Sequence, residues 1–480
     1  MPKRSRTSTR PTTTPAPRRS QEKTRLERYF RQRYPDLGEL TVIHPRAAGI
    51  DLGGKESHFV AAPVGEEIEV REFGRVTSQL MEMAQYLCDL GVETVAMEST
   101  GVYWMPVCDL LEACGLEVYL VNPHHVKHVP GRKKSDKLDC RWLQKLHTYG
   151  LLSASFRPAR EIRPLRSFLR HRTTLVRQAA DWLRRMHKVL DQMNVRPHKA
   201  LTDLGGTTGM RIVRALVAGE QDPAALARLR DPRCFCSEQE LREALTGFYQ
   251  PHLIQELGSC LRLYDGLLAE LGLVDAQIEE ALKRLAPQHA AELAARLAAD
   301  THALAEGKHA PSFNAAGYVE AVADRDPTLI PGIGPQIALS LLAELGMDMS
   351  KWPTEKHFGS HLTLAPQPKI SGGRVLSCHT RPGTHPGAVL FRQAAAAVVK
   401  MQDSALAAFY RRLALRIGKA KALTALAYKL ARMYYHLMKE GRQYVEAGVE
   451  AYEEKYRRHR VALLHKHAKQ LGFTLQPVAT

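Results

Sequence analysis

The order of strand and helix signals over residues 47–149 constrains the fold of this chain more than any other feature of the sequence. Three strand-like segments come first, and a helix, a strand, a helix, a strand and a helix then follow in turn. These segments are residues 47–51, 57–62, 68–73, 78–90, 93–97, 103–114, 117–121 and 136–149. Three early strands suit an antiparallel meander, whereas the later alternation suits parallel pairing. The order therefore predicts an α/β domain built on a mixed sheet.

This strand order is the one that ribonuclease-H-like folds use. A chain of 480 residues is too long for one compact domain, so we expect further domains. The first 20 residues hold six Lys/Arg and no acid among many Ser, Thr and Pro, which predicts disorder. We expect a disordered basic tail at 1–40, the α/β domain at 41–155, a helical region at 156–310, a mostly α C-terminal domain at 327–447 and a helical tail at 448–480.

Residues 162–193 carry a heptad pattern that predicts one long helix. Its apolar positions are Leu169, Val176, Leu183 and Leu190, with Leu165, Ala179 and Met186 at the companion positions. The pattern indicates a coiled-coil or helix-hairpin seam, which would also offer a means of joining protomers. Arginines recur every seven residues on one flank of the same helix, with few acids between them, and they indicate a nucleic-acid contact. These arginines are Arg163, Arg170, Arg177 and Arg184.

The charge of the chain indicates a polyanionic partner. Lys and Arg number 68 against 50 Asp and Glu, a net charge of +18. Nucleic acid is the usual partner for such a balance, and an anionic membrane surface is the alternative. No apolar run is long enough for a transmembrane helix, and no secretory signal begins the chain. The eight cysteines lack zinc-knuckle spacing, which predicts reduced thiols in the cytoplasm.

Four carboxylates stand where strands end or a helix begins. Asp51 ends the first strand and Glu98 ends the fourth, so the two can lie side by side in a mixed sheet. Asp136 and Asp139 open a helix and, three residues apart, project from one face. Divalent cations prefer carboxylate oxygens, and a pair of ions needs several of them. The sequence therefore predicts a divalent-metal site, for Mg²⁺ or Mn²⁺.

Two features mark the C-terminal domain. Residues 329–338 have the turn sequence of a helix-hairpin-helix, in which Gly332 and Gly334 would let backbone amides approach a phosphate. A Pro/Gly-rich loop at 365–387 then contains Ser371, Gly372, Gly373 and Arg374. A serine followed by two glycines can be open to a substrate, and a neighbouring arginine can hold a phosphate.

Several of these segments resemble the DEDD transposases of the insertion-sequence one-ten group. The matching stretches are Gly49-Ile50-Asp51, Met97-Glu98-Ser99-Thr100-Gly101-Val102-Tyr103, Val121-Asn122-Pro123, Lys134-Ser135-Asp136-Lys137-Leu138-Asp139-Cys140, Leu364-Ala365-Pro366 and Ser371-Gly372-Gly373-Arg374. Ser135 and Cys140 depart from the family's usual residues, but both acids of that block are present. The resemblance spans about residues 47–444 and implies a RuvC-like catalytic domain followed by a serine-bearing domain.

The resemblance also implies roles for these residues. Asp51, Glu98, Asp136 and Asp139 would be the DEDD set that binds Mg²⁺. Ser371 would be the nucleophile that holds DNA covalently, with Ser360 and Ser377 as nearby rivals. Such a transposase would act on donor and target DNA, guided by a structured bridge RNA, as a homo-oligomer (a dimer or tetramer) in the prokaryotic cytoplasm near the nucleoid.

Two other functions remain compatible with the sequence. One is a RuvC-like junction resolvase or nuclease, which would need the four acids but no serine. The other is a non-catalytic nucleic-acid-binding protein, against which the presence of all four acids argues.

Overall fold

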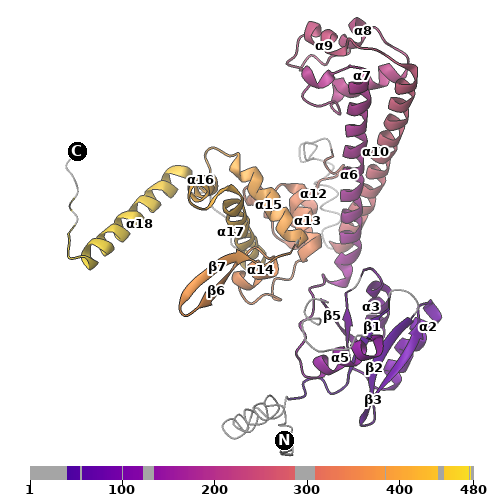
Figure 1. The fold of residues 1–480 in the computed structure, drawn as a ribbon, viewed down its shortest axis with the longest axis vertical. Helices are drawn as coiled ribbons and strands as arrows, with labels where there is room; N and C mark the ends of the chain where they lie inside the picture. The colour runs from indigo at the N-terminus through magenta and orange to yellow at the C-terminus, as the bar shows by residue number, and fades with distance from the viewer. Residues whose placement is uncertain are drawn as a thin grey trace, which may run out of the picture. The chain divides into compact units, whose positions relative to one another are not determined.

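The computed structural model describes residues 41–53, 57–99, 101–122, 135–286, 309–383, 385–441, 448–474 and 476. The chain divides into two compact units, Met1–Arg157 and Pro158–Thr480, and each is considered by itself (Figure 1). The expected basic tail at 1–40 lies outside the described residues, as do Thr100, Pro123 and Lys134 of the motifs above.

A five-stranded mixed sheet forms the centre of the first unit. Its strands are β1 (Ala47–Leu52), β2 (Ser57–Val64), β3 (Glu67–Gly74), β4 (Thr94–Glu98) and β5 (Glu117–Val121), in the order β3-β2-β1-β4-β5. Strands β1, β2 and β3 pair antiparallel, and β1, β4 and β5 pair parallel. The predicted meander followed by parallel strands is therefore confirmed, and the arrangement is consistent with a ribonuclease-H-like fold.

Helices cover both faces of this sheet. Helices α2 (Thr77–Asp89) and α3 (Trp104–Ala113) pack on one face, where Ile50 and Met97 are fully buried. Helix α5 (Asp136–Thr148) packs on the other face, with Leu143 against Ala96. Burying a side chain such as Ile50 contributes about 1.5–3 kcal/mol, so the larger α2/α3 core is the main source of stability.

Helix α5 rests directly on the backbone of β1. A Cβ added to Gly49 would lie 2.4 Å from the carbonyl oxygen of Cys140 and 2.3 Å from the amide nitrogen of Gln144. Only glycine leaves room for this approach, because any side chain would overlap main-chain atoms that cannot move aside. Gly49, two residues before Asp51, thus fixes the distance between α5 and the sheet.

The second unit begins with a long helical hairpin (Figure 1). Helix α6 (Arg163–Gln192) packs along α10 (Pro251–Leu285), and a cap closes one end of the pair. The cap contains α7 (Thr207–Val217), α8 (Pro223–Ala227) and α9 (Glu238–Leu245). Three short 3-10 turns also occur, η2 (Arg160–Ile162), η3 (Pro197–Lys199) and η4 (Pro327–Leu329).

The heptad seam of α6 is occupied within the chain. Leu165, Leu169, Ala179, Met186 and Leu190 are all buried, which confirms the seam as the core of a helix hairpin with α10. Helix α10 of the same chain covers most of this seam, while Val176 and Leu183 stay half-buried, and a role of the seam in joining protomers stays a prediction. The expected helical extension over 287–299 lies outside the described residues.

The rest of the second unit is mostly helical. Its helices are α12 (Ala315–Ala323), α13 (Pro335–Leu345), α14 (Glu355–His361), α15 (Pro386–Val399), α16 (Ala405–Ile417), α17 (Lys419–Glu440) and α18 (Gly448–Gln470). Rings of Phe358, Phe391 and Tyr434 form its core, with centroids 5.6–6.5 Å apart.

A β-hairpin replaces much of the loop expected at 365–387. Strands β6 (Pro366–Ser371) and β7 (Arg374–Thr380) pair antiparallel and are joined by Gly372 and Gly373. Both glycines have positive φ, +54° and +76°, as a two-residue turn between twisted strands requires. The Gly-Gly pair that indicated a flexible loop is thus the turn of a regular hairpin.

Candidate active site

Asp51 and Glu98 lie side by side at the ends of two parallel strands. In the register of β1 and β4, Ile50 is opposite Met97, so the next residue on each strand is one of the two acids. Both carboxylates are half-buried. The expectation that these two strand ends are neighbours is therefore confirmed.

Both acids point to the face of the sheet that α5 covers. Successive residues of a strand point to opposite faces, and Ile50 and Met97 are buried under α2 and α3. Asp51 and Glu98, one residue further on, therefore lie on the other face. Ala96 is on that face too, where it packs with α5.

The other two acids occupy the first turn of α5. Ser135 caps this helix by accepting a hydrogen bond from the amide of Leu138 at 3.4 Å. Asp136 precedes buried Cys140 by four residues and Asp139 precedes buried Leu143 by four, so both continue the sheet-facing stripe of α5 by one turn. Asp136 is exposed and Asp139 half-buried, and the helix N-terminus stabilises negative charge at both.

The first turn of α5 lies close to Asp51. Burial, together with the negative charge of Asp51, raises the pKa of the Cys140 thiol to about 11. A neutral, buried thiol is not a nucleophile, so Cys140 packs against the sheet rather than taking part in chemistry. The Cys140 carbonyl also lies against Gly49 of β1, so α5 begins next to the strand that carries Asp51.

Two polar contacts hold α5 in this position, and sequence reasoning missed both. The Gln144 side chain donates a hydrogen bond to the carbonyl of Ala47 at 3.3 Å. His147 Nε2 lies 2.9 Å from Thr94 Oγ1, and burial and the neighbouring His44 lower the pKa of His147 to about 4. Gln144 and His147 are polar residues on the buried face of the predicted helix, and this pattern is the sequence signal that could have indicated the two contacts.

The described residues do not form a closed metal site. Among them, no group of three or more His, Cys, Asp or Glu side chains lies close enough to hold an ion. The structure thus gathers Asp51, Glu98 and the start of α5 on one side of the sheet without bringing the four carboxylates to coordination distance. The donor chemistry still suits a hard cation, since carboxylate oxygens are what Mg²⁺ prefers.

Ser371 lies at the tip of the β6–β7 hairpin. It pairs with Arg374 across the two-glycine turn, and both side chains are exposed. Ser377, opposite Lys369 in the middle of β7, is half-buried. Ser360 is half-buried in α14. Of the three candidate serines, Ser371 is the one that a large substrate reaches most freely.

The two glycines of the expected helix-hairpin-helix differ in their surroundings. A Cβ on Gly332, whose φ is +82°, would lie 2.3 Å from the carbonyl oxygen of Ala394 on α15. Gly334 precedes α13, is exposed and has open space around its Cβ position. Gly332 therefore serves the packing of the turn on α15, and a phosphate contact through the backbone amides stays a prediction for both glycines.

The arginine row of α6 is not a uniform solvent-facing stripe. Arg170 donates two hydrogen bonds to the buried carboxylate of Glu344, at 2.7 and 2.9 Å, and Arg166 donates a third at 2.9 Å. Arg163 is half-buried and donates to the carbonyl of Pro158. The Arg170 guanidinium therefore ties α6 to α13, and with half of its side chain exposed a phosphate contact stays a prediction for Arg170 as for Arg163.

The remaining members of the row are exposed. Arg184 forms an ion pair with Asp181, one turn earlier on α6, and Arg177 is exposed in the middle of the helix. A nucleic-acid contact stays a prediction for Arg177 and Arg184, because exposed side chains can turn toward a phosphate at little cost.

Two family models match the chain, the first over the α/β domain and helix α6 and the second over part of the C-terminal helical region. Residues 48–195 match a DEDD family described as "Transposase", and residues 328–411 match the "Transposase IS116/IS110/IS902 family". No curated protein matches the chain significantly. Within the described residues, no helix is both long and apolar enough to cross a membrane. The first match contains all four acids and the second contains Ser371, and together they show that the chain belongs to the IS110 family of transposases.

Proposed function

We propose that this transposase cuts and joins DNA through Ser371 together with a divalent-metal site at Asp51, Glu98, Asp136 and Asp139. The observation that carries the proposal is the common face of the sheet on which Asp51 and Glu98 lie beside the start of α5. Packing alone does not call for carboxylates at two adjacent strand ends and in the covering helix turn, because each repels the others.

The serine step conserves the energy of the phosphodiester bond. The Ser371 oxygen bonds to phosphorus as the bond from phosphorus to a deoxyribose oxygen breaks, and that oxygen leaves with a proton as a free hydroxyl. Attack by the hydroxyl of another strand reverses the step and releases the serine. Arg374, opposite Ser371 in the hairpin, would hold a non-bridging phosphate oxygen.

The four acids would hold the metal. Mg²⁺ or Mn²⁺ bound there would stabilise the negative charge that builds up on the reacting phosphate. Helix α5 orients Asp136 and Asp139, and its contact with Gly49 sets their height above the sheet. Asp51 and Glu98 are oriented by the parallel register of β1 and β4.

A structured guide RNA is the further part of this proposal. The net charge of +18 and the exposed arginines of α6 support a polyanion larger than a short DNA contact. Arginine pairs with phosphates and also stacks on unpaired bases, which suits a folded RNA.

A metal-dependent nuclease is the second candidate function. Asp51 and Glu98 are held on a formed sheet, whereas Ser371 is on an exposed turn. This contrast favours a reaction that depends on the acids and not on the serine. A nuclease of this kind would hydrolyse DNA with water and would leave no bond between protein and DNA.

Trapping of the covalent intermediate separates the two candidates. The protein is incubated with labelled DNA ends of its element, RNA and Mg²⁺, and adducts are resolved on a denaturing gel. Ser371→Ala should bind DNA with unchanged affinity and form no adduct, whereas Ser360→Ala and Ser377→Ala, as matched controls, should form it. Glu98→Gln should abolish adduct formation without loss of folding.

Each other result has a defined meaning. An adduct from Ser371→Ala refutes the assignment of the nucleophile, and its loss in Ser377→Ala alone moves the role to that residue. Cleaved DNA without any adduct from the unmodified protein supports the nuclease. Full activity of Glu98→Gln would contradict the metal site.

A further inference from the structure

Helix α18 (Gly448–Gln470) is held to the rest of the second unit within its first three turns. The guanidinium of Arg412 on α16 lies 3.5 Å from the ring centroid of Tyr456 and 5.2 Å from that of Tyr452. It also lies 3.9 Å from the carboxylate of Glu453. These contacts attach one end of α18 to α16, and the helix continues past them (Figure 1).

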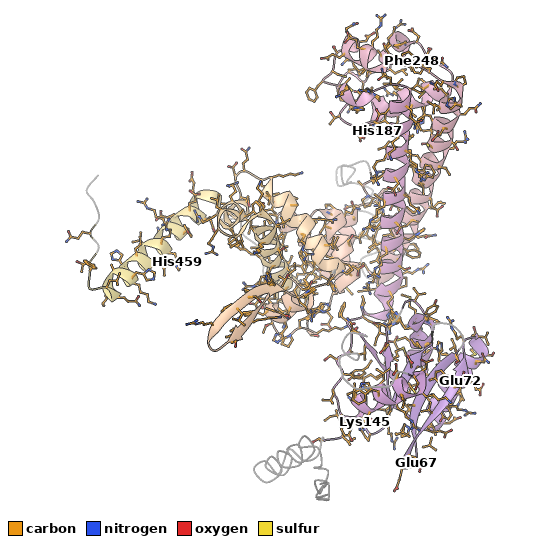
Figure 2. All side chains as sticks on the ribbon, viewed as in Figure 1. Glu67, Glu72, Lys145, His187, Phe248 and His459 are labelled. Atoms are coloured by element: carbon orange, nitrogen blue, oxygen red, sulfur yellow. The ribbon has the colours of Figure 1, made fainter. Side chains whose placement is uncertain are left out.

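Beyond Tyr456 the helix is basic and exposed. Residues 457–474 contain five Lys/Arg and three His but no Asp or Glu. Its described cations are all exposed, and Figure 2 shows side chains around this helix, His459 among them. These cations are Arg457, Arg458, Arg460, Lys466 and Lys469. Among the described cations of α18, Arg458 forms an ion pair with Glu454 at 2.9 Å, and because both side chains are largely exposed the pair neutralises little of this charge.

Neither family match reaches this helix, since the second ends at residue 411. We propose that α18, from Arg457 to its end, binds duplex DNA by lying in the major groove with its cations on the phosphates. The proposal rests on DNA being a partner of this transposase but on no detail of the catalytic site.

The shape of the helix favours DNA over RNA. A single helix with side chains is about 10–12 Å wide, which matches the major groove of B-form DNA at about 12 Å. The major groove of A-form RNA is deep and too narrow for it. Residues 457–470 would extend along the groove for about 20 Å at 1.5 Å per residue, enough to meet phosphates of both strands.

A second copy of the chain fits this helix less well. Val461, Leu464, Ala468 and Leu471 do form an apolar stripe with heptad spacing. The stripe spans two heptads, whereas a coiled coil usually needs about three or four. Arg457 lies four residues before Val461 on the same stripe, where it would oppose self-association.

An anionic membrane also fits less well. Amphipathic membrane helices keep their cations away from the apolar face. On α18 Arg460 lies four residues before Leu464, so a guanidinium interrupts the face that would enter the lipid. Duplex DNA can contact both the apolar side chains and the cations of this face, because thymine methyl groups meet apolar side chains and phosphates meet cations.

The test uses the full-length protein and a labelled duplex of arbitrary sequence, with binding followed by fluorescence anisotropy at several salt concentrations. One variant replaces the five exposed cations of α18 by glutamine, at Arg457, Arg458, Arg460, Lys466 and Lys469. The matched control replaces five exposed cations of α8–α10 by glutamine, at Arg228, Arg242, Arg262, Lys283 and Arg284. Circular dichroism checks the folding of both.

The α18 variant should bind the duplex about tenfold or more weakly and lose about 2–4 from the slope of log K against log salt, at about 0.9 per phosphate. The DNA affinity and the salt slope of the control variant should change much less. Bound protein should also protect guanine N7, in the major groove, from methylation, and the α18 variant should lose that protection.

Four results would overturn the proposal. The first is an equal loss of DNA affinity in the α18 variant and the control. The second and third are a loss of affinity only for hairpin RNA and a loss of affinity only for anionic phospholipid vesicles. The fourth is a change of oligomeric state in the α18 variant with its DNA affinity unchanged. The proposal and the catalytic assignment fail separately, because adduct formation by Ser371 does not report on this helix.

Discussion

Arg172 occupies a position of the α6 seam where the heptad pattern otherwise places apolar side chains. Its guanidinium is buried and pairs with buried Asp275 on α10, which also accepts a hydrogen bond from the amide of Ser312 at 3.1 Å. Arg172 donates a further bond to the carbonyl of His309 at 3.0 Å. The pair therefore fixes the register of the two long helices and attaches the chain that follows them.

Asp275→Ala should lower the free energy of unfolding by about 3–5 kcal/mol, because it leaves a buried guanidinium without its carboxylate. Glu280→Ala is the matched control on the same helix, since Glu280 forms an exposed pair with Arg284 and should cost less than about 1 kcal/mol. Urea denaturation followed by circular dichroism measures both.

The double variant Arg172→Met with Asp275→Leu should recover most of the loss, because apolar side chains fill the seam without an unpaired charge. Equal effects of Asp275→Ala and Glu280→Ala would show that the buried pair does not hold the hairpin together.

The same residue shows what the sequence does and does not reveal. An arginine at a seam position is visible in the heptad pattern, but its partner is 103 residues away and no local pattern points to Asp275. Glu344 is similar, since an acid among the apolar residues of α13 is visible but its two arginines on α6 are not. Pairings across long stretches of chain depend on the tertiary fold.

At the level of elements, the sheet and the long helices were predictable and the β6–β7 hairpin was not. Strands β1 and β4 have buried apolar residues in a short run, and α6 has a period that only a helix satisfies. All six residues of β6 are exposed, so no alternation of apolar and polar residues marks it as a strand. The candidate site followed the same division, because two acids lie on the predictable strands β1 and β4 and two on the predictable helix α5.

The turn before α13 offers a comparison of two glycines in one element. Gly332→Ala should destabilise the protein by about 2 kcal/mol or more, because its Cβ meets a backbone oxygen and its φ is positive. Gly334→Ala should cost less than about 1 kcal/mol, since its Cβ enters open space. Thermal melting of both variants measures the difference.

Similar melting temperatures for the two would contradict the packing of Gly332 on α15. Weaker DNA binding by Gly334→Ala, with stability unchanged, would support the phosphate contact predicted for its amide.

At the scale of the whole molecule, the C-terminal part of the chain carries one of the dense concentrations of positive charge. Residues 405–439 contain eight Lys/Arg and no acid, in α16 and α17, and the basic part of α18 follows. Fixed charge of one sign accelerates encounter with nucleic acid and makes binding sensitive to salt.

The proposed guide role predicts that recombination requires RNA. Protein freed of nucleic acid and supplied with the DNA ends of its element should recombine them only after the structured RNA of the element is added. Arg177→Gln with Arg184→Gln should weaken RNA binding severalfold, more at low salt than at high salt, because the lost phosphate contacts are the salt-sensitive part of binding. Arg196→Gln with Arg242→Gln, on exposed positions near the cap, is the matched control. Efficient recombination without RNA would refute the guide role.

The contact between Gly49 and α5 has a consequence for how tolerant the catalytic domain is to change. Main-chain atoms of the helix meet main-chain atoms of the strand there, so no side-chain volume sets the spacing between them. Side chains in the core under α2 and α3, on the other face of the sheet, can therefore be replaced by larger or smaller ones. Such substitutions leave the distance between Asp51 and the first turn of α5 unchanged. A designer could therefore redesign that core for thermal stability while the acids keep their positions.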